Sequence, residues 1–171
     1  MKRILNGLIV ATMAASLFGA GIASAQEKPI SIDVAPILSI PTGDLADFAG
    51  IGFGAEAIGN YEVMPKLIAT GAIGYIYHLE GDLGSASAIP IMAGAKYFVA
   101  PNIFVGGEIG FHMWTTEVDL GGQFGTVEGD ETEVTLTPQV GYVMDKLTIT
   151  GQYAISGDFS YLAARVSYTV W

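Results

Sequence analysis

The stretch EVTLTPQVGYV (Glu133–Val143) alternates between polar and apolar side chains. A period of two residues is typical of a β-strand with one polar and one apolar face, because successive side chains of a strand point to opposite sides. The apolar face carries Val134, Leu136, Val140 and Tyr142, and the polar face carries Glu133, Thr135, Thr137 and Gln139. This stretch is therefore predicted to be a strand.

Similar segments recur along the chain and predict an all-β fold. They are Ile30–Ile40, Ile51–Tyr61, Lys66–Leu79, Ser87–Val99, Ile103–Trp114, Leu147–Ser156 and Tyr161–Trp171. The breaks EVMP, APN and MDK are short, whereas PTGDLADFAG, EGDLGSA and TTEVDLGGQFGTVEGDET are longer and GDFS is a brief last one. In an up-and-down meander, alternate connections lie at the same end. We therefore expect tight turns and both termini at one end and loops at the other.

When the charged residue of each strand is placed on one face, no strand places a charge on the other. The polar face holds Asp33, Glu56, Asn60, Lys66, His78, Lys96, Glu108, His112, Glu133, Gln139, Gln152 and Arg165. The opposite face holds large aliphatic and aromatic residues such as Ile73, Tyr75 and Ile109. A water-soluble barrel with either face outside would have a poor surface. The pattern favours an eight-stranded antiparallel up-and-down transmembrane β-barrel with lipid outside and a polar lumen.

Lys96, within the apolar run IPIMAGAKYFV (Ile89–Val99), then points into the lumen. On the lipid face near the middle of the membrane a lysine would cost about 2–4 kcal/mol. We predict a buried network of charges, with Lys96 near Glu108 across the turn APN and Arg165 reaching either Asp33 or Glu56. Its members are Asp33, Glu56, Lys96, Glu108 and Arg165.

The first 25 residues have the layout of a secretory signal peptide: Lys2 and Arg3, an apolar stretch, and the small residues Ala23–Ala25. An uncleaved membrane anchor is the alternative. The predicted mature domain is residues 26–171. The chain has no cysteine and a formal net charge of −10, so neither disulfides nor binding to nucleic-acid phosphates is expected. No cofactor and no metal centre is predicted.

Two further features bear on the barrel. Tyr61, Tyr97, Tyr142 and Tyr168 lie towards the tight turns, and Tyr75, Tyr77 and Phe111 lie towards the loops, which is typical of two aromatic girdles; ordinary strand preference for tyrosine is the alternative. Pro36, Pro90 and Pro138 each remove a ladder donor, so a bulge is expected wherever one of them shifts the register.

The chain resembles small bacterial outer-membrane β-barrel proteins, the eight-stranded OmpA/OmpX-like porin-family group. The resemblance rests on PTGDLADFAGIGFGAEAIGNYEV (Pro41–Val63), ATGAIGYIYHL (Ala69–Leu79), IPIMAGAKYFV and the terminal Trp171. It implies an outer membrane of a Gram-negative bacterium, with loops extracellular and termini periplasmic. It also implies outer-membrane lipid and the outer-membrane assembly machinery as partners, with Tyr168 and Trp171 as the assembly signal. Alternation along the last strand places Tyr168 and Val170 on the lipid-facing side, but it does not place Trp171 there.

That orientation places many acidic residues and no lysine or arginine at the loop end, which attracts cations. They are Asp44, Asp47, Glu80, Asp82, Glu117, Asp119, Glu128, Asp130, Glu131 and Asp158. A solvated acidic surface is one reading. A divalent-cation site in EGDETE, formed by Glu128, Asp130, Glu131 and Glu133, is the other, since oxygen ligands suit Ca²⁺.

An eight-stranded barrel is just wide enough to be filled by side chains, which predicts a non-enzymatic structural or surface-interaction role. Three alternatives stay open: a small channel or solute-binding barrel, a membrane-embedded lipid-modifying enzyme, and a soluble secreted barrel. The enzyme would use His78 and His112 with Ser85, Ser87 or Thr115, but no nucleophile motif is present. Both histidines are expected at the rim of the loop end.

Overall fold

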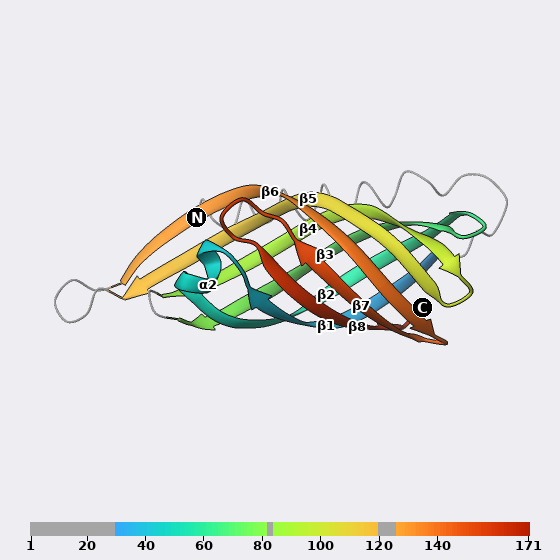
Figure 1. The fold of residues 1–171 in the computed structure, drawn as a ribbon, viewed down its shortest axis with the longest axis horizontal. Coiled ribbons are helices and arrows are strands. Elements are labelled where there is room, and N and C mark those ends of the chain that lie inside the picture. Colours follow the sequence, from blue (N-terminus) through green and yellow to red (C-terminus); the bar gives the residue numbers. More distant parts are fainter. Residues whose placement is uncertain (1–29, 82–83, 120–125) are drawn as a thin grey trace.

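The computed structural model describes residues 30–81, 84–119 and 126–171, so the predicted signal peptide lies outside the described residues. Eight antiparallel strands form a closed barrel, in which each strand pairs with its sequence neighbours and β8 pairs with β1 (Figure 1). The elements are β1 (Ile30–Pro41), the short helix α2 (Asp44–Phe48), β2 (Ala49–Met64), β3 (Leu67–Glu80), β4 (Ser85–Ala100), β5 (Ile103–Asp119), β6 (Thr126–Met144), β7 (Leu147–Ala154) and β8 (Tyr161–Thr169).

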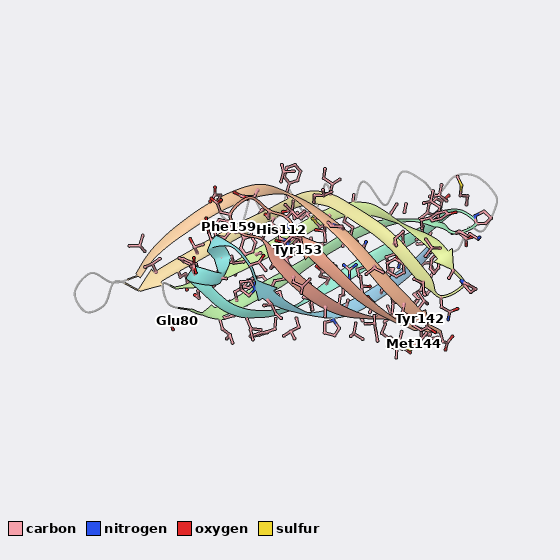
Figure 2. The ribbon with its side chains drawn as sticks, in the orientation of Figure 1. Glu80, His112, Tyr142, Met144, Tyr153 and Phe159 are labelled. Atoms are coloured by element: carbon pink, nitrogen blue, oxygen red, sulfur yellow. The ribbon has the colours of Figure 1, made fainter. Side chains whose placement is uncertain are left out.

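The outer face of the barrel is apolar and the charges lie inside. Ile109 and Phe111 are 57% and 53% exposed, whereas Lys96 and Glu108 are 5% and 3% exposed. Of the residues assigned to the polar face, Glu133 is half-buried, Lys66 is exposed and all the others are buried. Figure 2 shows side chains projecting outward along the whole barrel. Such a surface suits hydrocarbon rather than water, and the predicted transmembrane barrel is confirmed.

Tight turns and loops gather at opposite ends, as the lengths of the breaks predict. The β2–β3, β4–β5 and β6–β7 turns lie at the right of Figure 1, and α2 and the loops lie at the left. Lys66, which was assigned to a strand, instead lies in the β2–β3 turn with a φ of 73°. Its assignment to the polar face was wrong because the chain reverses one residue before β3 begins.

The long break TTEVDLGGQFGTVEGDET is largely strand rather than loop. β5 and β6 continue through it as a hairpin, and their ladder extends to Asp119 opposite Thr126. This hairpin reaches beyond the other strands at the loop end (Figure 1). On its other side β6 pairs with β7 only from Gln139 to Met144 and through one bridge between Leu136 and Ile155. Within the described residues, the backbone edge of β6 from 126 to 135 is therefore unpaired on that side.

The three prolines interrupt ladders without shifting the register. Pairs on both sides of Pro36 between β1 and β8, of Pro90 between β3 and β4, and of Pro138 between β6 and β7 keep one register. The shifts that do occur lie elsewhere, for example between Phe98 and Ala100. Because the register is preserved across each proline, the strand that contains it keeps the same face inside on both sides of the proline.

α2 is five residues long, and no helix of the described residues is long and apolar enough to cross a membrane. Its Leu45 is buried, and the Leu45 amide donates to the carbonyl of Asp158 in the β7–β8 loop. The amide of Thr42 donates to the carbonyl of Ser160 in the same loop. These two bonds tie the β1–β2 and β7–β8 connections together at the loop end of the barrel.

Candidate functional site: the barrel interior and the loop end

The half of the interior nearer the tight turns is organised around Arg165. The guanidinium is 1% exposed and donates through Nη1 to Glu56 Oε2 at 2.7 Å and through Nη2 to Gln139 Oε1 at 2.8 Å. Nη2 also lies 3.6 Å from Glu108 Oε1. One cation therefore joins two carboxylates and an amide from three other strands, in a fork geometry that suits a guanidinium.

The register explains how these side chains meet. Arg165 on β8 pairs with Ile37 on β1, and Glu56 on β2 pairs with Ala35, two residues away on the same inward face of β1. The small side chain of Ala35 leaves room for Arg165 to reach across β1 to Glu56. Charge attraction and the space over Ala35 together fix the direction of the guanidinium.

Lys96 belongs to a second group. Its Nζ donates to Asn60 Oδ1 at 3.0 Å, and Asn60 Nδ2 donates to Asp33 Oδ2 at 2.9 Å. The ammonium also lies 5.4 Å from the centre of the Phe104 ring, a distance typical of a cation–π contact. Asn60 is thus the bridge between the buried lysine and the buried aspartate.

The five predicted network residues are all buried inside the barrel, in two groups. Arg165 reaches Glu56, and no ion pair joins it to Asp33 within the described residues. Lys96 is diagonal to Glu108 in the β4–β5 ladder, as predicted, yet it bonds to Asn60 and forms no ion pair with Glu108. Asn60, Gln139 and Thr70, which donates to Glu108 at 3.4 Å, complete the groups and were absent from the predicted network.

The half of the interior nearer the loops is aromatic and apolar. Trp114, Tyr161, Ile37 and Ile76 are buried there with several alanines, and Leu45 of α2 packs against them. The predicted polar lumen is therefore confirmed in part: small and aromatic side chains fill this half, and a second apolar cluster forms around Ile58. Parity places Trp114 on the same face as His112 and Tyr161 on the same face as Arg165, but the sequence assignment of the inward face named only polar residues.

Both histidines lie within this aromatic layer. His78 and His112 are 0% and 1% exposed, so their expected place at the rim was wrong. His78 Nε2 lies 3.0 Å from Ser39 Oγ, and His112 Nε2 lies 2.7 Å from Tyr161 Oη. His112 packs against Trp114, which in turn stacks on Phe159 of the β7–β8 loop; His112 and Phe159 are labelled in Figure 2. The extension of β5 and the covering α2 bury positions that a shorter strand would leave at the mouth.

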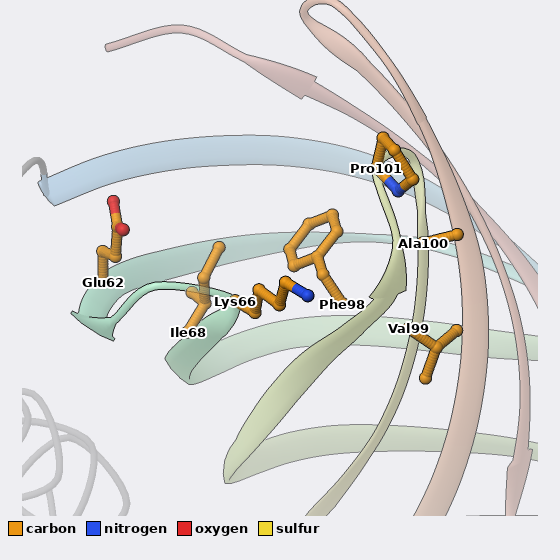
Figure 3. Close-up of a pocket in the computed structure, with 7 residues that line it drawn as sticks. All are labelled: Glu62, Lys66, Ile68, Phe98, Val99, Ala100 and Pro101. Carbon is orange, nitrogen blue, oxygen red and sulfur yellow. The ribbon is translucent and has the colours of Figure 1, made fainter.

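A shallow cleft of about 420 Å³ opens at the tight-turn end, between the β2–β3 and β4–β5 turns (Figure 3). Lys66 and Phe98 lie at its centre, and Phe98 packs against the buried Phe104 at 5.9 Å between ring centres. Because Phe104 is fully buried beneath it, the cleft ends within the turn region. It is lined by Glu62, Lys66, Ile68, Phe98, Val99, Ala100 and Pro101.

The acidic segment predicted to bind a divalent cation lies on β6 and not in a loop. Side chains alternate along the strand, so Asp130 and Glu131 project from opposite faces. Asp130 Oδ1 accepts a hydrogen bond from Thr115 Oγ1 at 3.0 Å. The side chain of Glu128 lies outside the described side chains. No grouping of potential metal ligands occurs among the described residues, and the cation site stays a prediction.

The C-terminal end of the chain continues to pair beyond β8. Tyr168 is an exposed aromatic on the outer face, and Trp171, 73% exposed, follows the strand. The Trp171 carbonyl accepts from the Ile32 amide at 2.8 Å. Trp171 therefore overhangs the end of β8 while its backbone stays attached to β1, and its reading as an assembly signal stays a prediction.

The fold is that of small outer-membrane β-barrels. The crystal structure of Ail, the attachment invasion locus protein of Yersinia pestis, aligns with a TM-score of 0.65 at 14% identity, covering 84% of this chain and 98% of that chain. Neisserial surface protein A (NspA) aligns at 0.50 with 15% identity, over 81% and 96%. A de novo designed transmembrane β-barrel aligns at 0.53 with 17% identity, over 85% and 100%. No protein-family profile and no curated protein matches the sequence.

Proposed function

We propose that this protein is a non-enzymatic outer-membrane barrel of a Gram-negative bacterium that binds partners at the cell surface. The loops and the β5–β6 hairpin face outward, and the termini and tight turns face the periplasm. The filled interior is the observation that carries this proposal. Arg165 with its carboxylates occupies one half, and the aromatic layer under α2 occupies the other. A barrel so filled has its binding surface outside.

A channel is the main alternative, and conductance separates the two. Ions crossing the barrel would have to pass Arg165, Glu56 and Glu108, all nearly fully buried, and then Trp114 and Tyr161. In planar bilayers at neutral pH we therefore expect the purified protein to give no discrete conductance steps. Regular steps that persist in a variant with an altered loop end would overturn the proposal of a non-conducting barrel.

A lipid-modifying enzyme has less support than either. Ser39 and His78 form a hydroxyl–imidazole pair at 3.0 Å, but both residues are 0% exposed. Nucleophilic catalysis also needs a third group that orients the base. Among the described residues, His78 Nδ1 has no hydrogen-bond partner. Neither histidine bonds to Ser85, Ser87 or Thr115.

Charge indicates the class of partner. Ail has been crystallised in complex with the heparin analogue sucrose octasulfate, a polyanion. The loop end of the present chain carries acids such as Asp44, Asp130 and Glu131 and no lysine or arginine. A surface of one sign attracts the opposite sign. We therefore infer that the partner presents a cationic surface or segment.

The test is titration calorimetry on the protein in neutral phosphatidylcholine nanodiscs. Oligolysine at low salt should bind, and sucrose octasulfate should not. The variant Asp130→Asn/Glu131→Gln should weaken oligolysine binding, because both side chains are exposed on the protruding hairpin. Asp145→Asn, in the β6–β7 turn at the opposite end, is the matched control and should leave binding unchanged. Binding of the polyanion in preference to oligolysine would contradict this assignment.

A further inference from the structure

The aromatic layer under α2 contains two buried imidazoles. His78 from β3 and His112 from β5 each pack against the same two rings. Their centres lie 5.7 and 5.8 Å from that of Trp114, and both lie 5.8 Å from that of Tyr161. The outer side of Trp114 is stacked on Phe159 of the β7–β8 loop at 5.0 Å. The two histidines are thus packed within this aromatic layer, which closes the lumen on the side of the loops and is called the plug below.

Each imidazole has one satisfied nitrogen and one unsatisfied nitrogen. Nε2 of His78 is paired with Ser39, and Nε2 of His112 is paired with Tyr161. Nδ1 of both rings is buried without a hydrogen-bond partner in the described part of the chain. A neutral imidazole can leave one nitrogen bare as an acceptor, but an imidazolium donates at both nitrogens. The layer as built therefore suits two uncharged rings.

The charged groups around the layer come from four strands, one loop and α2, which packs on the layer through Leu45 and carries Asp44 and Asp47. Glu56 on β2, Glu108 on β5 and Arg165 on β8 lie below it and are the charged neighbours of Tyr161. From β6, Glu133 is directly opposite His112 in the ladder. Glu131 and Asp158, from β6 and the β7–β8 loop, are the charged neighbours of Glu133. β1 and β3 contribute the uncharged Ser39 and His78 itself.

We propose that this layer is an acid-operated plug, in which His112 leaves the aromatic stack for Glu133 when its imidazole takes up a proton. The ring binds one proton from solvent, and its Nδ1 then becomes a donor. A cation held among aromatic rings, with no carboxylate in hydrogen-bond contact, is unfavourable. The Glu133 carboxylate, which lies over Gly157 in the β7–β8 loop, is half-buried and supplies an acceptor towards the loop side.

The consequence is local and lies at the loop end. When His112 turns towards Glu133, Trp114 loses one of its stacked neighbours, and the Trp114–Phe159 contact, one of several that hold the β7–β8 loop, loosens. The strand ladders do not depend on this contact. The acidic medium therefore opens the plug while the barrel persists. This inference concerns the interior and is independent of the class of surface partner.

Trp114 fluorescence tests the proposal, because the chain has two tryptophans and Trp171→Phe leaves Trp114 alone. From pH 8 to pH 4.5, we expect its emission in nanodiscs to shift to longer wavelength as water enters, with unchanged far-ultraviolet circular dichroism. Glu133→Gln, which keeps the shape but removes the carboxylate, should abolish the shift above pH 5. Asp145→Asn, in the β6–β7 turn at the opposite end of the barrel, removes one carboxylate far from the layer; it is the control and should retain the shift.

The ¹⁵N resonances of the two histidines in the unsubstituted protein give a second readout that needs no core substitution. We expect the His112 ring to become doubly protonated over the range of the fluorescence shift. If His112 stays neutral at pH 4.5, or if the emission shifts equally in Glu133→Gln, the proposal is overturned. Loss of the strand signal together with the shift would indicate global unfolding and would also overturn it.

Discussion

Replacing Arg165 by methionine should destabilise the barrel strongly. The substitution removes the guanidinium that contacts Glu56 at 2.7 Å and leaves Glu108 with the 3.4 Å bond from Thr70. Glu56 and Glu108 are 6% and 3% exposed, so water does not replace the lost partner. Removing one member of a buried ion pair typically costs about 3–5 kcal/mol. We expect a loss of that size in the free energy of unfolding.

The companion variants show whether the loss comes from the unpaired charge. Glu56→Gln alone keeps a carbonyl oxygen for Arg165 and should cost about 1.5–3 kcal/mol, the value of a charged hydrogen bond. The double variant Arg165→Met/Glu56→Gln removes both charges, so it should be no less stable than Arg165→Met. Urea unfolding in phospholipid vesicles, followed by tryptophan emission, measures all three. A double variant whose loss equals the sum of the single losses would refute the reasoning.

Two further substitutions test the outer face and the packing of the ladder. Ile109→Lys, at a 57% exposed position between the two groups of surface aromatics, should lower the free energy of unfolding in vesicles by about 2–4 kcal/mol. Thr132→Lys on the hairpin is the control and should be neutral. Equal effects in the same urea assay would argue against lipid contact at Ile109. Gly94→Ala should lower the unfolding midpoint, because a Cβ at this position overlaps the Gly107 carbonyl oxygen and such overpacking costs about 1–3 kcal/mol. In Gly151→Ala the new Cβ meets no atom within 4 Å, so the midpoint should not change. A tolerated Gly94→Ala would show that β4 and β5 can move apart.

The architecture was predictable because one rule repeats on every strand. A residue such as Lys96 can point only inward if the opposite face meets lipid, and period-two alternation carries that decision along the strand. The same logic placed Asp33, Glu56, Glu108 and Arg165 inside, where the structure has them. The lengths of the breaks predicted that tight turns lie at one end of the barrel and loops at the other. Errors occurred where alternation ends, at Lys66 in a turn and in the hairpin beyond Trp114.

The partners inside the barrel were less predictable, because parity gives the direction of a side chain and not its reach. Arg165 and Glu56 pair across an intervening strand, and this depends on Ala35 being small at the crossing point. Lys96 had the carboxylate of Glu108 on the neighbouring strand, yet it bonds to Asn60, whose amide can serve a cation and Asp33 at once. Three-dimensional spacing decided both choices, and no local pattern in the sequence records it.

The interior also shows why this barrel keeps most of its buried aromatic residues away from its charges, with Phe104 beside Lys96 as the exception. A lysine or arginine inside needs acceptors, and every acceptor needs space that an aromatic ring would occupy. The tight-turn half satisfies its charges with Asn60, Gln139 and Thr70. The loop half has no lysine or arginine on its strands, so Trp114 and Tyr161 can fill it with neutral imidazoles between them. Acid adds a positive charge to the loop half, whose strands contain no lysine or arginine. For this reason we expect sensitivity to pH at His112 before we expect it at Arg165.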